Sequence, residues 1–348
     1  MTRRSCEVSL YGARVEVEAD ASEVFDLLDA ELGVFFGIGA PAPRMSPATT
    51  LGRVVFTGES GELPRDEPAP IVLHSGSHSY DVRRGRLWDD GLGVRTVESV
   101  DTGSVLRMDA SARTVRVENP DARRGAEDVR RVVRDLLFLP WLESLGAVVV
   151  HGAAIVDAAE RAVLVLGDRG AGKTTLFMAA ASAEGAGALS CERVVIVPTP
   201  EGLTAFACPE KISVFPGTLR SFEKTRHLAG EVSEGEWARE AKVRVPWRDL
   251  FAALGLRAVN GAILSRVLFP RWVPEGGEHS APASEAAYFR LVDHVVTGRD
   301  HNRPDWLGWF RPSRTEATLG ALSRLKSRAG TWTDVDTARR LVLEGWSE

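Results

Sequence analysis

Apolar and polar residues alternate along the first third of the chain. Val15 and Val17 stand between charged residues, and Val115 and Val117 alternate with polar residues in the same way. A period of two residues places successive side chains on opposite faces, which is the pattern of half-buried β-strands. Residues from about 7 to 118 are therefore predicted to form mostly β structure.

Segments rich in glycine, proline and charged residues interrupt this alternation. Two of them, residues 84–86 and 90–93, carry glycine between apolar stretches and are expected to be hairpin turns. One short helix is predicted over Ala21–Leu32, and Asp20 or Ser22 is its expected N-cap.

The apolar period changes to that of a helix after Asn119-Pro120-Asp121. Five apolar residues then follow at the spacing of one continuous helical face: Val129, Val132, Val133, Leu136 and Leu137. Arg130, Arg131 and Arg134 occupy the other side of this helix. These arginines could meet a phosphate, but we interpret them as a solvated helix face.

Continuous apolar runs dominate the middle of the chain. Two closely spaced strands are predicted at residues 147–152 and 153–157, and a third at 162–166. A helix at 175–181 and another buried strand at 194–197 come next. Buried strands that alternate with a helix are typical of an α/β domain.

The last third of the chain is expected to be largely helical at its end. Residues 237–254 are predicted to mix helix and loop. Leu319, Leu322 and Leu325 share one helical stripe, and a last short helix is expected to begin near Thr333-Asp334, where a capping residue precedes apolar positions.

A glycine-rich loop lies between the strand at 162–166 and the helix at 175–181. It fits the phosphate-binding (Walker A, P-loop) pattern G-x-x-x-x-G-K-S/T, in which backbone N–H groups surround phosphate oxygens at a helix N-terminus. Lys173 is expected to reach the β- and γ-phosphates, and the Thr174 hydroxyl to bind Mg²⁺. The alternative is a glycine-rich turn that happens to carry a lysine. The expected nucleotide-binding residues are Gly167, Asp168, Arg169, Gly170, Ala171, Gly172, Lys173, Thr174 and Thr175.

The composition of the 348 residues argues against several other classes of protein. A net charge of −5 gives no reason to expect nucleic-acid binding. No apolar run approaches the ~20 residues that span a bilayer, and the N-terminal arginines lack the apolar stretch of a signal peptide. Three cysteines without metal-ligand spacing suit a reducing compartment. We therefore expect a cytoplasmic protein that binds neither membranes nor nucleic acid.

A phosphate loop needs acidic partners before it can support phosphoryl transfer. Mg²⁺ takes oxygen ligands, and an acceptor hydroxyl must lose its proton. The segment 187–195, GALSCERVV, follows the helix of the loop and leads into a buried strand. Its polar residues are therefore expected to lie at a strand end near the phosphates.

Three segments in this order, 151–156, 163–176 and 187–195, resemble the catalytic core of the HPr kinase/phosphorylase superfamily. That family places a His-Gly or His-Ala strand pair before the phosphate loop and an Asp-Asp pair after the helix of the loop. The long β-rich region before the core also resembles, in layout, the HPr-kinase-like enzymes of peptide natural-product pathways.

The resemblance implies a kinase core related to phosphoenolpyruvate carboxykinase rather than to RecA-like motor ATPases. It implies transfer of the γ-phosphoryl group of ATP to a hydroxyl, typically a serine side chain on a protein or peptide. It also places His151 at the edge of the active site, although a histidine beside a strand is often structural. Whether His151 is neutral or charged at pH 7 stays open.

The acidic pair of the family falls on Cys191 and Glu192, so one carboxylate is missing. A cysteine cannot supply the hard oxygen ligand that Mg²⁺ requires. The alternative is that Glu192 and Arg193 form an exposed turn and Cys191 packs as a small apolar residue. The candidate catalytic residues are Lys173, Glu192 and His151, and the candidate metal ligands are Thr174 and Glu192.

Charged residues further along are weaker candidates. Glu210 and Lys211 lie where related kinases place residues that approach the metal, but an exposed ion pair is the simpler interpretation. Lys242 and Arg244 would share one side of a strand, and we interpret them as surface residues.

The segment 298–309 is dense in functional side chains and could close over a substrate. Trp306, Trp309 and Phe310 are also what a docked C-terminal segment would bury, and we favour that interpretation.

We predict an α/β (α+β) protein with two domains. Residues 1–135 would form a β-rich accessory or substrate-recognition domain, and residues 136–348 an HPr-kinase-like P-loop kinase domain with a mixed sheet, flanking helices and a helical C-terminal segment. The expected function is Mg²⁺- and ATP-dependent phosphorylation of a hydroxyl, on a serine of a peptide or protein.

Alternatives to this function stay open. One is a kinase of a small metabolite, and another is a kinase-derived nucleotide-binding regulator or scaffold with little or no transfer. A motor or transport ATPase is disfavoured because no strand ends in a Walker-B Asp-Glu at the expected distance. The family often forms hexamers, so a homo-oligomer is also open.

Overall fold

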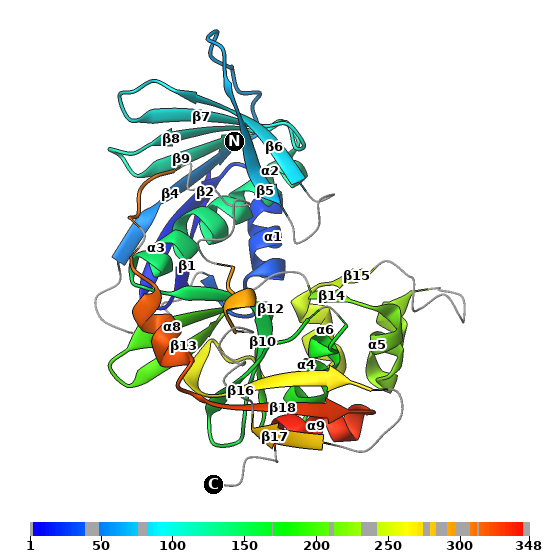
Figure 1. Ribbon diagram of the computed structural model, residues 1–348. Coiled ribbons are helices and arrows are strands. Elements are labelled where there is room, and N and C mark those ends of the chain that lie inside the picture. The colour runs from blue at the N-terminus through cyan, green and yellow to red at the C-terminus, as the bar shows by residue number, and fades with distance from the viewer. Residues whose placement is uncertain are drawn as a thin grey trace. The chain divides into compact units, whose positions relative to one another are not determined.

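The computed structural model of the protein describes residues 3–38, 49–75, 82–168, 170–208, 212–230, 242–273, 279–282, 291–296, 307–311 and 313–343. The chain divides into two compact units, which are described separately. The first contains Met1–Leu145 and Gly298–Ser313, and the second contains Gly146–Thr297 and Arg314–Glu348. In Figure 1 the sheet of the first unit is coloured from blue to cyan, and most of the second unit runs from green to red.

The described strands of the first unit form one mixed sheet, in the order β3-β1-β2-β4-β9-β8-β7-β6-β5. They are β1 (Arg4–Leu10), β2 (Ala13–Ala19), β3 (Gly37–Ile38), β4 (Thr49–Thr57), β5 (Ala69–Ser75), β6 (Val82–Asp89), β7 (Val94–Ser99), β8 (Val105–Asp109) and β9 (Thr114–Glu118). β4 pairs in parallel with β2 and β9, and the other neighbours are antiparallel. The prediction of mostly β structure between about 7 and 118 is confirmed.

One of the two expected hairpin turns is wrong. Residues 90–93 do join β6 to β7, but residues 84–86 lie inside β6. Gly85 is paired on both sides, with β5 and with β7. A Cβ at Gly85 would lie 2.8 Å from the Leu73 side chain, so this glycine serves close packing within a sheet and not a turn.

The helices of the first unit are α1 (Ser22–Glu31), α2 (Ala122–Arg131), the π-helix η1 (Val132–Phe138) and α3 (Leu139–Ser144). The helix expected over 21–32 is confirmed, but its expected cap is wrong. Ala21 holds the N-cap position without a side-chain hydrogen bond, and the Asp20 carboxylate instead accepts one from the Gly58 N–H at 3.1 Å.

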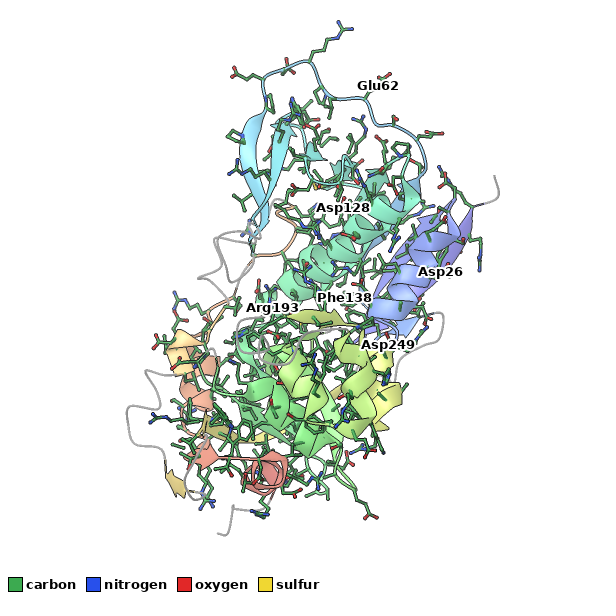
Figure 2. All side chains as sticks on the ribbon, turned by 90° about the vertical axis from the view of Figure 1, so that its right-hand side faces the viewer. Asp26, Glu62, Asp128, Phe138, Arg193 and Asp249 are labelled. Atoms are coloured by element: carbon green, nitrogen blue, oxygen red, sulfur yellow. The ribbon has the colours of Figure 1, made fainter. Side chains whose placement is uncertain are left out.

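The arginines of the helical run α2–η1 are not solvated, contrary to their interpretation from the sequence. Each is held in an ion pair, at N···O distances of 2.9, 3.1 and 2.7 Å: Arg130–Glu31, Arg131–Asp128 and Arg134–Asp135. Their side chains are at most 14% exposed. Figure 2 shows the reason, because α1 (with Asp26) lies alongside the run that carries Asp128 and Phe138.

The described strands of the second unit form a mixed sheet, in the order β11-β10-β12-β13-β16-β18-β17, and a small separate sheet, β14-β15. They are β10 (Val148–Val156), β11 (Arg161–Val165), β12 (Gly187–Thr199), β13 (Gly202–Ala207), β14 (Ile212–Val214), β15 (Val243–Val245), β16 (Gly261–Trp272), β17 (His279–Pro282) and β18 (Lys326–Trp332). β16 also pairs with β11, which closes β11, β10, β12, β13 and β16 into a ring.

The two strands expected at 147–152 and 153–157 are a single strand, β10, because both halves pair with β12. A β-bulge between Ala154 and Ile155 shifts the register within it. The strand expected at 162–166 is confirmed as β11, and the residues expected as a strand at 194–197 lie in β12.

The helices of the second unit are α4 (Lys173–Ala181), α5 (Pro216–Arg220), the 3-10 helix η2 (Glu223–Ala229), α6 (Trp247–Leu254), α8 (Glu316–Leu322) and α9 (Val335–Leu343). α4 confirms the helix expected after the glycine-rich loop. The C-terminal region is not only helical, because Leu325 lies beyond α8 and is followed by β18. The expected cap of α9 is confirmed, since the Asp334 carboxylate accepts a hydrogen bond from the Thr337 N–H at 2.8 Å.

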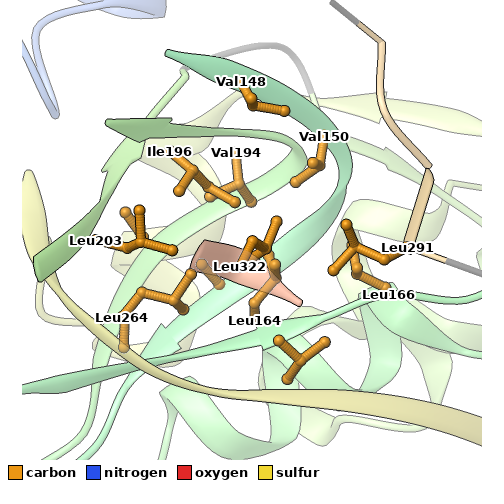
Figure 3. Packing of buried hydrophobic residues seen from close by; sticks show 14 of the residues in the cluster. Val148, Val150, Leu164, Leu166, Val194, Ile196, Leu203, Leu264, Leu291 and Leu322 are labelled. Atoms are coloured by element: carbon orange, nitrogen blue, oxygen red, sulfur yellow. The ribbon is translucent and has the colours of Figure 1, made fainter. Parts of the chain in front are cut away.

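A buried apolar cluster fixes the strands that lead to the loop. Its members from four strands of the ring include Val148, Val150, Leu164, Val194, Ile196 and Leu264, and Leu291 and Leu322 pack against them (Figure 3). The predicted fold class, α/β (α+β) with a β-rich N-terminal region, is confirmed. Among the described helices, none combines the length and the apolar character needed to cross a membrane.

Candidate functional site

The glycine-rich loop connects β11 to α4. It passes through Gly170 (φ +88°) and Gly172 (φ +83°), a backbone conformation that favours glycine. A Cβ at Gly172 would also collide with the ring of Trp332 in β18. The Trp332 indole N–H donates to the Ala171 carbonyl at 3.3 Å. The shape of the loop is therefore set both by its own glycines and by β18 packed against it.

Lys173 lies over the first residues of the loop. Its ammonium donates to the Gly167 carbonyl at 2.6 Å and to the Asp168 carbonyl at 3.3 Å. Burial lowers the pKa of Lys173, while the nearby Glu192 and Cys191 oppose that shift. Phosphate oxygens are stronger acceptors for an ammonium group than neutral carbonyls are. Together with the N-terminus of α4, this lysine fits the β- and γ-phosphates of a nucleotide.

The two threonines that follow Lys173 have different neighbours. Thr174 Oγ1 lies 4.0 Å from the Cys191 Sγ of β12, and Thr175 Oγ1 lies 3.1 Å from Thr218 Oγ1 of α5. Burial, with a smaller contribution from Glu192, raises the pKa of Cys191 to about 12. Cys191 is therefore a neutral thiol and offers no hard oxygen to a cation.

The pairing of β10 with β12 brings His151 and Glu192 to the loop. His151 lies opposite Arg193, and Gly152 lies opposite Glu192. A Cβ at Gly152 would lie 2.7 Å from the Leu166 side chain, so the glycine next to His151 allows the end of β11 to pack closely against β10.

The segment 187–195 lies within β12 and not at a strand end, so that expectation is wrong. The alternative of an exposed turn is wrong as well, because the Glu192 side chain is only 17% exposed. Cys191 is buried, as a small apolar residue would be. Glu192 has a φ of +81°, which is a strained conformation for a residue with a side chain. Strain of this kind is often found at functional sites.

Glu192 lies between two basic side chains. Its Oε2 is 4.0 Å from His151 Nδ1, and its Oε1 is 3.9 Å from Lys242 Nζ. The Lys242 ammonium also lies 5.4 Å from the centre of the Phe215 ring, a cation–π contact. Lys242 is exposed, as expected of a surface residue, and its ammonium also belongs to the group around Glu192. Arg244, two residues further on, is exposed in β15.

His151 is neutral at pH 7. Burial first, and then positive charges with Lys173 the largest, lower its pKa to about 4. The backbone N–H of His151 donates to the backbone carbonyl of His294 at 2.7 Å. Burial and Lys173 also lower the pKa of His294. Two neutral imidazoles thus lie near Lys173.

A pocket of about 800 Å³ adjoins the loop. Its lining comes from the loop itself, from residues 269–272 at the end of β16, from residues 329–331 of β18, and from Asp293 and His294. Only the loop part of this lining could be predicted from the sequence. β16 and β18 reach the loop through long-range pairing, and no motif marks them. The only local signal is the polar pair Asp293-His294 in front of the apolar Val295-Val296.

Several residues named from the sequence lie outside the described part of the chain. They are Arg169, Glu210, Lys211, Trp306 and most of the segment 298–309. Trp309 and Phe310 are described and belong to the first unit. The Arg113 guanidinium lies 6.0 and 5.3 Å from the centres of their rings, as a docked segment would place them.

Within the residues that the structure describes, no three His, Cys, Asp or Glu side chains gather into a metal-binding group. A Mg²⁺ ion that enters with a nucleotide needs few protein ligands, because phosphate and water oxygens supply the rest. Thr174 and Glu192 fit that limited role, while the buried thiol of Cys191 does not.

Comparisons with known proteins find likenesses among solved structures. No family model matches the chain, and no curated protein matches its sequence. Among solved structures, the Hpr(Ser) kinase/phosphatase from Coxiella burnetii is similar at 14% identity, over 39% of this chain and 72% of that chain, with a TM-score of 0.23. At this TM-score the likeness supports no inference about activity.

Proposed function

We propose that this protein is a kinase that uses Mg²⁺ and ATP to transfer the γ-phosphoryl group to a hydroxyl, on a serine of a peptide or protein. One observation carries the proposal: a strained, mostly buried glutamate, Glu192, lies near enough to the lysine of a phosphate loop to oppose the lowering of the pKa of Lys173. The 4.0 Å contact of Thr174 with Cys191 joins α4 to β12 at the residue before Glu192. A loop alone can bind phosphate, but transfer to a hydroxyl also needs a proton acceptor.

Each side chain of the site has a separate task in this proposal. The loop amides and Lys173 hold the phosphates and neutralise their charge. Glu192 takes the proton of the acceptor hydroxyl, whose oxygen bonds to the γ-phosphorus as the bond to ADP breaks. His151 and Lys242 position the Glu192 carboxylate from either side. Bound Mg²⁺ would add positive charge at the phosphates, held by Thr174 and by an oxygen of Glu192.

A transfer assay with γ-labelled ATP tests the proposal. The acceptors to offer are serine-containing peptides and proteins, beginning with the products of the neighbouring genes, and small hydroxyl metabolites. We expect stable label on a hydroxyl, and a decrease of about 100-fold or more for Lys173→Ala. Lys224→Ala, which removes an exposed lysine of η2, is the matched control and should leave transfer unchanged. Equal transfer by the Lys173→Ala protein would contradict the proposal.

One observation favours a second function. Cys191 places a thiol at a position where a carboxylate would bind Mg²⁺. The chain would then be a nucleotide-binding regulator or scaffold without efficient transfer. Measurements of ATP binding and transfer for the wild type and for Cys191→Asp separate the two functions. Tight binding with no transfer in either protein would reject the kinase and support the regulator.

A further inference from the structure

The pocket beside the loop lies apart from the proposed proton acceptor. Glu192 and His151 are not among its lining residues, whereas Gly167, Asp168 and Ala171 of the loop are. Its volume of about 800 Å³ falls within the range of small-molecule sites. A ligand whose phosphates occupy the loop could therefore extend into this pocket.

The strand register shows which of the lining side chains share one face of the sheet. Across β16 and β18, Phe269 pairs with Ala329 and Arg271 pairs with Thr331. These four side chains share one face of the sheet, because alternate residues of a strand point to the same side. Phe269 and Ala329 pack with the apolar cluster on that face, to which Leu291 also belongs (Figure 3). The pocket thus has an apolar floor and, further along the strands, a guanidinium and a hydroxyl.

The intervening residues of the two strands face the other way. Trp332 packs against Gly172, and Gly330 lies against Leu341 of α9. Trp272 pairs with Trp332, shares its face and also lines the pocket. Arg271, beside Thr331 on the other face, is the planar group that we take as the candidate for contact with a ligand.

The pocket lies at the edge of the sheet where the loop lies, next to the position expected for the phosphates of a nucleotide. β11, β16 and β18 are parallel, so their carboxyl ends lie at the same edge as the loop. Ligands of α/β sheets bind at this edge. Lys173 marks the phosphate position at Gly167 and Asp168, which also line the pocket.

We propose that this pocket holds the nucleoside part of the ATP, an inference that rests on the proposed function. The base would lie above the apolar floor of Phe269, with the planar guanidinium of Arg271 stacked on it. Thr331, Asp293 and His294 at the rim supply polar groups for the ribose and the edge of the base. The acceptor hydroxyl then approaches from the side of Glu192.

The test compares the binding of Mg·ATP and of Mg²⁺ with inorganic tripolyphosphate, which lacks the nucleoside. Both are titrated calorimetrically into the full chain and into Arg271→Ala. We expect Arg271→Ala to weaken ATP binding by about 10-fold and to leave tripolyphosphate binding within about two-fold. Arg324→Ala, an exposed arginine of the second unit outside the pocket, is the matched control. Thr331→Phe, which fills the pocket, should likewise weaken the binding of ATP and leave the binding of tripolyphosphate unchanged.

The outcomes separate this inference from the proposed function. Equal weakening of ATP and tripolyphosphate by Arg271→Ala would make Arg271 a phosphate ligand and overturn the inference. Unchanged ATP binding in both pocket variants would overturn it as well. If neither compound binds the wild type, the proposed function itself fails, and the inference fails with it.

Discussion

Around the phosphate loop, the carboxylate of Glu192 lies near side chains whose pKa burial shifts towards the uncharged form. The pKa of His151 and of His294 is lowered by burial first and by Lys173 next. The pKa of Cys191 is raised, so its thiol is also neutral. Glu192, which has a positive φ, is the carboxylate that we propose as the proton acceptor.

The titration of His151 checks this electrostatic arrangement. Because the charged imidazole is disfavoured, we expect it to stay neutral until the pH falls to about 4, below its ordinary pKa of 6.5. In the unfolded chain the His151 imidazole takes up a proton near its ordinary pKa, whereas in the folded protein it does so only near pH 4. The free energy of unfolding therefore decreases as the pH falls from 6.5 towards 4. An NMR titration, assigned by comparison with His151→Gln, gives the midpoint. A midpoint near 6.5 would contradict the burial and charge described here.

At the scale of elements, two strands outside the loop, one of them distant in sequence, turn it into a site. β12 carries Cys191 and Glu192 to the start of α4, and β18 carries Trp332 to Gly172. In the first unit, α1 plays a comparable role, because its Glu31 forms an ion pair with Arg130 of α2. In each case an element supplied from elsewhere changes what a local sequence does.

The contact between β18 and the loop predicts an unequal effect of two glycine substitutions. Gly255 at the end of α6 has φ +67° and open space around its missing side chain, so Gly255→Ala should cost about 1 kcal/mol from backbone strain. Gly172→Ala adds a collision with Trp332 and should cost about 3 kcal/mol and weaken ATP binding. Chemical denaturation and calorimetry measure the two effects. Equal small losses with intact ATP binding would show that β18 does not constrain the loop.

A second prediction compares a buried ion pair, Arg130–Glu31, with an exposed one, Arg124–Asp121. Arg130→Ala leaves Glu31, which is 9% exposed, without its partner and should cost about 3 kcal/mol of unfolding free energy. Arg124→Ala removes an exposed pair with Asp121, with side chains 65% and 51% exposed, and should cost less than about 0.5 kcal/mol. Denaturant unfolding of both variants compares them. A cost for Arg130→Ala as small as for Arg124→Ala would mean that this side is solvated after all.

At the scale of the whole molecule, the sequence predicted the elements whose structure depends on residues close together along the chain. The strand β11, the helix α4 and the loop between them follow from apolar runs and a glycine-lysine motif within one short stretch. Contacts between distant segments could not be predicted in this way. Nothing around Lys242 indicates that it lies 3.9 Å from Glu192, and nothing around Arg271 indicates that β16 ends beside the loop. The strand β12 was missed as one element because the polar run Ser190 to Arg193 interrupts its apolar pattern.

Ligand binding should stabilise the second unit as a whole. At a Mg·ATP concentration about 100-fold above Kd, mass action predicts a gain of about 2.7 kcal/mol in the free energy of unfolding. Hydrogen exchange of amides in β12 reports this gain, because their slowest exchange requires the unit to open. Lys173→Ala should remove most of the gain at the same ATP concentration. An equal gain in the Lys173→Ala protein would place the nucleotide elsewhere.

The central claim is that Glu192 beside the loop makes this chain a kinase. Single-turnover transfer of labelled phosphate from ATP to the acceptor, by the wild type and by Glu192→Gln, tests it most directly. We expect Glu192→Gln to bind Mg·ATP within a few-fold of the wild type and to transfer at least about 100-fold more slowly, because the amide cannot take the proton. Transfer by Glu192→Gln at the wild-type rate would contradict the claim.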